Sequence, residues 1–147
     1  MNTTTITNDD SENNDTDEIA NQKKGWAGIF LLERHRDFIY RKFKPKFEKQ
    51  TDCHITTAFN VTGLDEDFNL ERLKIIGYAG GETIECIVVE VNSKLFRPSG
   101  GYYHITLSYN PALATPKDSN VLLKQGFNGI DHIHLPPKGC EYKFVEF

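Results

Sequence analysis

Hydrophobic and polar positions alternate in two segments of this chain, residues 53–59 and 102–108, and both segments contain the same motif. The motif is His-Ile-Thr, at His54-Ile55-Thr56 and again at His104-Ile105-Thr106. Because alternate side chains of a strand share a face, each histidine should point the same way as its threonine, with the isoleucine in the opposite layer. We expect the two strands to be neighbours, which would bring two imidazoles and two hydroxyls into one cleft.

The rest of the pattern predicts an α+β domain with a compact, mostly antiparallel sheet and one or two helices. The spacing of Phe38, Ile39, Phe43 and Phe47 is typical of a short amphipathic helix within residues 34–47 that ends near Lys44-Pro45. Gly80-Gly81 is a hairpin signal, and Ser119 is a candidate N-cap of a second helix. Further strands are predicted at residues 26–32, 73–79, 84–91 and 140–147.

The first 22 residues differ in composition from the rest of the 147-residue chain. They contain six Asp or Glu residues and no Lys or Arg, so we expect a disordered acidic tail followed by one folded domain at residues 23–147. The tail lacks the basic and apolar parts of a signal peptide, and no apolar run is long enough to span a bilayer. We therefore expect a cytoplasmic protein with no membrane partner and no obligate protein partner.

The charge of the folded part and its cysteines exclude few classes of function. All 17 Lys and Arg residues and 15 of the 21 Asp and Glu residues follow the tail, so the folded part has a charge of about +2. This charge accommodates an anionic ligand but is not typical of a nucleic-acid-binding domain, and an ordinary solvated surface explains it equally well. Cys53, Cys86 and Cys140 form no CxxC motif, and we expect them to be reduced and largely buried.

The repeated motif carries the chemistry of paired acid–base catalysis. Histidine titrates near neutral pH, so one imidazole can accept a proton while the other donates one. Thr56 and Thr106 can donate hydrogen bonds to the non-bridging oxygens of a phosphate, where charge builds up. This set needs no carboxylate and implies no metal or other cofactor. The sequence leaves open which of His54 and His104 is the acid and which is the base.

The two motifs resemble the signature of the 2H phosphoesterases, in which two His-x-Thr/Ser motifs lie on adjacent central strands. The resemblance covers most of residues 25–125 and includes the leading strand, the helix after it and the hairpin at residues 73–91. The Pro-Lys-Asp-Ser-Asn stretch at residues 116–120 looks like a branch found in phages and in RNA-repair-like proteins. Phage anti-CBASS phosphodiesterases, which cut cyclic oligonucleotide signals, belong to the same superfamily, and a phage origin would place the protein in the host cytoplasm. One departure is the spacing, because the two motifs are only 50 positions apart, fewer than in the members that act on bacterial and archaeal RNA ends.

Five further residues are candidate substrate ligands. Alternation puts Tyr102 and Ser108 on the face of His104, where Tyr102 can stack on a base and Ser108 can extend the phosphate contacts. The resembling branch has its own polar motif at the positions of Lys117, Ser119 and Asn120, and Lys117 can pair with a phosphate. For Tyr102 the alternative is an aromatic side chain on the sheet surface, and for Lys117 it is a solvated lysine.

Asp131-His132-Ile133-His134 is the competing motif. Two histidines at alternate strand positions can bind a metal when a carboxylate joins them, but the spacing marks no third ligand. We expect both histidines in a loop beside Pro136-Pro137. His35 is expected at the surface of the first helix, and Trp26 in the core at the sheet edge, with base stacking as an alternative.

The sequence therefore favours a metal-independent 2H-type phosphodiesterase, a hydrolase or transesterifying nuclease with no cofactor. Its substrate would be an RNA-type phosphate, either a cyclic oligonucleotide or an RNA end with a 2′,3′-cyclic phosphate. A non-catalytic nucleotide- or RNA-binding module of the same fold is the second hypothesis. A metal-dependent enzyme built on His132 and His134 is the third.

Overall fold

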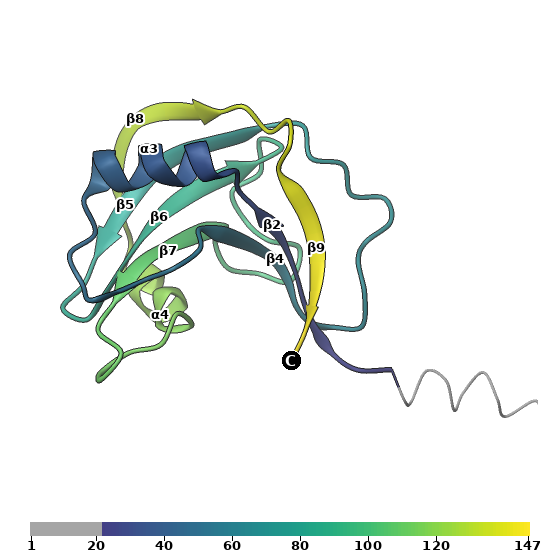
Figure 1. The fold of residues 1–147 in the computed structure, drawn as a ribbon, viewed down its shortest axis with the longest axis horizontal. Coiled ribbons are helices and arrows are strands. Elements are labelled where there is room, and N and C mark those ends of the chain that lie inside the picture. Colours follow the sequence, from purple (N-terminus) through teal and green to yellow (C-terminus); the bar gives the residue numbers. More distant parts are fainter. Residues whose placement is uncertain (1–21) are drawn as a thin grey trace, which may run out of the picture.

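The computed structural model describes residues 22–147, and the predicted tail lies outside them except for Gln22. The described part is α+β, with two helices, α3 (Glu33–Phe43) and α4 (Asp118–Lys124), and with strands that all pair antiparallel. Both helices are shorter than a membrane crossing requires, and no helix within residues 22–147 is long and apolar enough to span a bilayer. The strands form two sheets, whereas the sequence predicted one (Figure 1).

The larger sheet has five strands in the order β3-β7-β6-β5-β8. Its strands are β3 (Lys49–Gln50), β5 (Leu73–Gly80), β6 (Ile84–Val91), β7 (His104–Tyr109) and β8 (Asn128–Leu135). The central strand β6 has the predicted bounds, and the predicted hairpin at Gly80-Gly81 joins it to β5. Almost every residue of β6 is buried, because one face of this strand packs on α4 and the other on the main core.

The smaller sheet has three strands in the order β4-β2-β9. They are β2 (Gly25–Phe30), β4 (His54–Val61) and β9 (Glu141–Glu146), so the predicted final strand is confirmed and pairs beside the first. Figure 1 shows this sheet at one side of the molecule, with β4 lying next to β7 of the larger sheet.

The two His-Ile-Thr strands do lie next to each other, but they belong to different sheets and not to the single sheet that the sequence predicted. β3 is a hydrogen-bonded neighbour of β7, and the chain keeps this contact through Thr51, whose N–H donates to the Leu107 carbonyl over 3.3 Å. The backbone then turns at Cys53, which has a left-handed φ of 56°, and continues as β4, paired with β2. After this bend, no hydrogen-bonded ladder joins β4 to β7.

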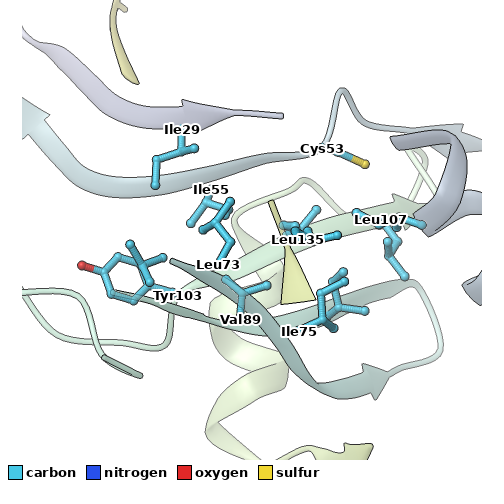
Figure 2. Packing of buried hydrophobic residues seen from close by; sticks show 13 residues of the cluster. Ile29, Cys53, Ile55, Leu73, Ile75, Val89, Tyr103, Leu107 and Leu135 are labelled. Atoms are coloured by element: carbon cyan, nitrogen blue, oxygen red, sulfur yellow. The ribbon is translucent and has the colours of Figure 1, made fainter. Parts of the chain in front are cut away.

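The main core fills the space between one face of the five-stranded sheet and a second layer made of α3 and the three-stranded sheet (Figure 1). Ile55 and Ile105 are completely buried in it, as the alternating pattern predicted. Figure 2 shows Ile29 and Ile55 of the smaller sheet facing the side chains of the larger one. The labelled members of this core in Figure 2 are Ile29, Cys53, Ile55, Leu73, Ile75, Val89, Tyr103, Leu107 and Leu135.

Three local predictions are wrong. Ser119 is not an N-cap, because α4 begins at Asp118 and the Ser119 side chain is fully buried within the helix. His132 and His134 lie in strand β8 and not in a loop. His35 is buried at 4% exposure, because it occupies the inward face of α3 with Ile39, four residues further along the helix.

Candidate active site

A pocket of about 380 Å³ lies where the outer faces of β4 and β7 meet α4 and the loops around it. Its polar lining comes from both motifs, from two loops and from α4, and comprises His54, Thr56, Arg97, His104, Thr106, Lys117 and Asn120. Its apolar lining is Trp26, Phe59 and Pro116. The pocket thus joins both motifs, and six of the nine predicted site residues line it. We call this the main pocket.

His54 is held in one orientation by a carboxylate and by two aromatic rings. Its Nδ1 lies 2.6 Å from Oδ1 of Asp52, which is on the other side of the bend at Cys53. The imidazole packs on Trp26, with ring centroids 4.5 Å apart, and on Phe30 at 5.6 Å. An Nδ1–H that donates to Asp52 leaves Nε2 as the nitrogen available to a ligand in the main pocket. Asp52 was not predicted, although its spacing from His54 was the signal for it.

The Trp26 ring reaches His54 because Gly28 leaves room for it. A Cβ atom on Gly28 would lie 2.6 Å from Cζ3 of Trp26 and 2.9 Å from the Ile55 carbonyl oxygen. The indole therefore lies across the place where any other residue would have a side chain. Trp26 is half-buried and lines the main pocket, so the predicted core position was only partly correct.

His104 is more enclosed than His54 and has a different partner. Its Nδ1 lies 3.0 Å from the main-chain carbonyl oxygen of Tyr102, so Nδ1 carries the proton and Nε2 is left as an acceptor. Burial lowers the pKa of His104 to about 4, and the positive charge of Arg97 and the neighbouring His54 add to the effect. His104 is therefore neutral at neutral pH, with Nε2 able to accept a proton.

The two threonines differ in how firmly they are held. Oγ1 of Thr106 lies 2.9 Å from Oγ of Ser119 and 3.5 Å from the Pro116 carbonyl oxygen, so the hydroxyl is tied to α4 and to the loop before it. Ser119 is fully buried and does not line the main pocket, so its position suits the support of Thr106 rather than direct contact with a ligand. Thr56 lies on the opposite side of the pocket and is half-buried.

Arg97 supplies a positive charge that the sequence did not single out. Its Nε donates to the Gly100 carbonyl over 3.1 Å, and Nη2 donates to Oδ1 of Asn120 over 3.1 Å. Burial lowers the pKa of Arg97, yet a guanidinium stays charged at any pH at which the protein is folded. The loop that carries Arg97 directly precedes the second motif strand, but no local pattern marks the residue, because its hydrogen bond to Asn120 places it in the site.

The main pocket is complementary to an anion. Lys117 lies on the same side as Asn120, and its Nζ sits 5.2 Å from the centre of the Phe59 ring. Together with Arg97 it places two positive charges on the lining, and none of the described residues that line the pocket is acidic. The folded part of the chain has almost no net charge, so this local excess is a property of the pocket.

Besides Ser119, two predicted ligands lie outside the main pocket. Ser108 is turned to the other face of the sheet, because β7 has one extra residue there: Thr106 pairs with Cys86 but Ser108 pairs with Glu85. Its hydroxyl donates to the buried Glu85 carboxylate over 2.5 Å. Tyr102 does lie on the His104 face of the sheet, but its ring stacks on Phe96 and does not line the main pocket.

The competing metal motif is not assembled. His132 and His134 are exposed on the edge strand β8, away from the main pocket. Within residues 22–147, no group of three or more His, Cys, Asp or Glu side chains is arranged to hold a metal ion. Comparisons of the chain with protein-family models, with curated proteins and with solved structures find no match.

Proposed function

We propose that this protein is a metal-independent phosphodiesterase that acts on RNA-type phosphates and uses His54 and His104 as its acid–base pair. One observation carries the proposal. Two identical motifs from different sheets meet in a single pocket whose charged lining groups are Arg97 and Lys117. A phosphodiester needs a proton acceptor, a proton donor and charge neutralisation, and the pocket contains groups for each task.

The hydrogen bonds of the two histidines suggest their roles in cleaving a 3′–5′ linkage. His104 is neutral with a free Nε2, so it accepts the proton of the ribose 2′-hydroxyl as the 2′-oxygen attacks phosphorus. His54 donates a proton from Nε2 to the departing 5′-oxygen as the phosphorus–oxygen bond breaks. Asp52 balances the positive charge on the His54 ring before that transfer. The products are a 2′,3′-cyclic phosphate and a free 5′-hydroxyl.

The same groups in exchanged roles hydrolyse the cyclic phosphate. His54 then accepts a proton from water while the water oxygen bonds to phosphorus, and His104 donates a proton to the 2′-oxygen that leaves. The burial that keeps His104 neutral favours the first reaction and slows the second, because the second requires His104 to be protonated. In both reactions Thr56 and Thr106 donate hydrogen bonds to the non-bridging oxygens, and Arg97 offsets their charge.

A panel of RNA dinucleotides, cyclic di- and trinucleotides and RNA ends with a 2′,3′-cyclic phosphate tests the proposal. The reactions are run in excess EDTA and the products identified by mass spectrometry. We expect cleavage in EDTA and no cleavage of the substrate that carries 2′-deoxyribose at the attacking position. Cleavage of the deoxy substrate would make water the nucleophile. Complete loss in EDTA with recovery on adding zinc or manganese would overturn the metal-independent proposal.

The second candidate is a binding module that holds a nucleotide without cleaving it. The packed rings of Trp26 and His54 favour this alternative, because an aromatic wall also suits a protein that only captures a base. Tight binding of a dinucleotide with no product from any member of the panel would support the binding module over the enzyme.

A further inference from the structure

A second pocket adjoins the main one and has a different lining. It has a volume of about 360 Å³, within the range of small-molecule sites. Phe96 and Tyr102 supply its aromatic lining, and Gly100-Gly101 and Lys124 lie around them. We call this the side pocket. Arg97 and Asn120 line both pockets, so the two cavities meet at the hydrogen-bonded pair that these residues form.

The side pocket presents an aromatic ring that no described part of the chain covers. Phe96 is 54% exposed, which is unusual for so large an apolar side chain. Its ring stacks on Tyr102 at 4.8 Å, and Tyr102 is in turn braced edge-on by Phe127 at 5.3 Å. The Phe96 ring is therefore held in a fixed orientation with much of its surface free. Such a ring can stack on any nucleobase.

Arg97 is fixed at the boundary between the pockets by the loop that carries it. Gly101 has a φ of +83°, and a Cβ atom there would lie 2.6 Å from Nη2 of Arg97. Only glycine allows the guanidinium to lie this close to the loop while Nε is bonded to the Gly100 carbonyl. Within residues 22–147, Arg97 forms no ion pair with a carboxylate. Its charge is thus available to an anion bound at the boundary between the two pockets.

We propose that the substrate spans both pockets: one nucleotide lies beside the histidines, the adjoining base stacks on Phe96, and Arg97 binds the phosphate that links them. This inference rests on the proposed phosphodiesterase function and makes molecules with at least two linked nucleotides the preferred substrates. The physical reason is that a nucleoside 2′,3′-cyclic phosphate has one base, and so cannot fill the side pocket while its phosphate lies between the histidines.

The test compares two substrates and three variants at Phe96. The extended substrate is an RNA dinucleotide, and the minimal substrate is a uridine 3′-phosphodiester of methanol, which has neither a second base nor any other ring on the leaving group. We expect Phe96→Ala and Phe96→Leu to raise KM for the dinucleotide about tenfold with little change in kcat. Phe96→Trp should restore the KM, because it returns an aromatic face, and every variant should cleave the minimal substrate at the wild-type rate. Leu113→Ala is the control, since Leu113 is 69% exposed and lies outside both pockets.

The outcomes separate this inference from the function on which it rests. If the minimal substrate is cleaved and Phe96→Ala leaves the dinucleotide KM unchanged, the side pocket is not a base site and the enzyme proposal stands. If neither substrate is cleaved, the enzyme proposal fails. Binding of the 2′-deoxy dinucleotide, measured by calorimetry, then decides the side pocket alone. A tenfold weaker Kd in Phe96→Ala supports the base site, and an equal Kd overturns it.

Discussion

The hydroxyl of Thr51 donates a hydrogen bond to the main-chain carbonyl of Thr106. This bond joins the segment that leads into the first His-Ile-Thr motif to the threonine of the second. The N–H of Cys53 lies 3.3 Å from the same Thr51 oxygen, so the hydroxyl also supports the bend that turns the chain away from β7. Thr51 therefore relates the two motifs directly, although they belong to different sheets.

Replacing Thr51 by valine should remove the hydrogen bond that fixes the position of the first motif relative to the second. Valine keeps the shape but removes the hydroxyl, which leaves the Thr106 carbonyl without this donor and costs about 1–2 kcal/mol of unfolding free energy. We also expect kcat for the dinucleotide to fall at least about fivefold, because the two histidines lose their fixed relation. Urea unfolding and steady-state kinetics measure the two effects. Thr51→Ser, which keeps the hydroxyl, should retain kcat, and equal losses in both variants would contradict this role.

Removing either pocket histidine should abolish turnover without unfolding the protein. His54→Ala and His104→Ala should each lower kcat at least about a hundredfold, because each removes a separate proton transfer. The double variant should be little worse than either single one, since the two groups act as a unit. His132→Ala and His134→Ala are the matched controls on the exposed edge strand and should cost little. A near wild-type rate in either pocket variant would make that histidine structural.

The pH profile should reflect the burial of His104. Protonation of His104 blocks its role as acceptor, so kcat/KM for dinucleotide cleavage should rise with pH through about 4 and fall again when the proton donor is lost. Hydrolysis of the 2′,3′-cyclic phosphate should show the opposite trend near that pH, because it needs protonated His104. At neutral pH the cyclic phosphate should accumulate.

Removing the charge of Arg97 tests why the acid limb of kcat/KM lies at such a low pH. The guanidinium of Arg97 is one of the groups that lower the pKa of His104, so Arg97→Gln should move the acid limb of kcat/KM to higher pH. The variant will also bind the dinucleotide more weakly, which lowers kcat/KM at every pH. The pH of the acid limb is a separate quantity, taken from the midpoint of the rise in kcat/KM. An acid limb near 6.5 in the wild-type enzyme would contradict the assignment of His104 as a buried, neutral base.

Gly28→Ala should be disruptive although glycine and alanine differ by one methyl group. The new Cβ would collide with Trp26 and with the Ile55 carbonyl oxygen, at 2.6 Å and 2.9 Å. We expect a loss of about 1–3 kcal/mol in unfolding free energy and a higher KM, because the indole must leave the His54 ring. Gly63→Ala is the control, since nothing lies within 4 Å of a Cβ there. Thermal unfolding and kinetics with both variants give the comparison.

The sequence predicted strands and buried side chains correctly where the evidence lies within a few neighbouring residues. The β-branched run of β6 has the expected bounds, and alternation correctly placed Ile55 and Ile105 in the core. The same reasoning could not foresee two sheets, because the change of partner depends on a left-handed φ at Cys53, and no glycine marks that position. Ser108 illustrates the same limit, since a one-residue irregularity in pairing turned its side chain to the opposite face.

The candidate site was predictable only where its residues share a motif. His54, Thr56, His104 and Thr106 repeat a recognisable spacing, and the structure places all four in the main pocket. Arg97 and Phe96 gave no signal, because their positions depend on how a loop between β6 and β7 folds back over α4. Their contribution follows from long-range contacts, which a single sequence does not reveal.

The bend at Cys53 also makes the hydrophobic interior a spacer between the two histidines. Each histidine is attached to a different sheet, and those sheets are held apart by apolar side chains such as Ile29, Ile55 and Ile105 rather than by a shared ladder. The volume of these side chains sets the angle between the sheets, and that angle sets the gap between the imidazoles. A methyl group added or removed in this interior should therefore change the gap between the histidines, although the residues concerned do not line the main pocket.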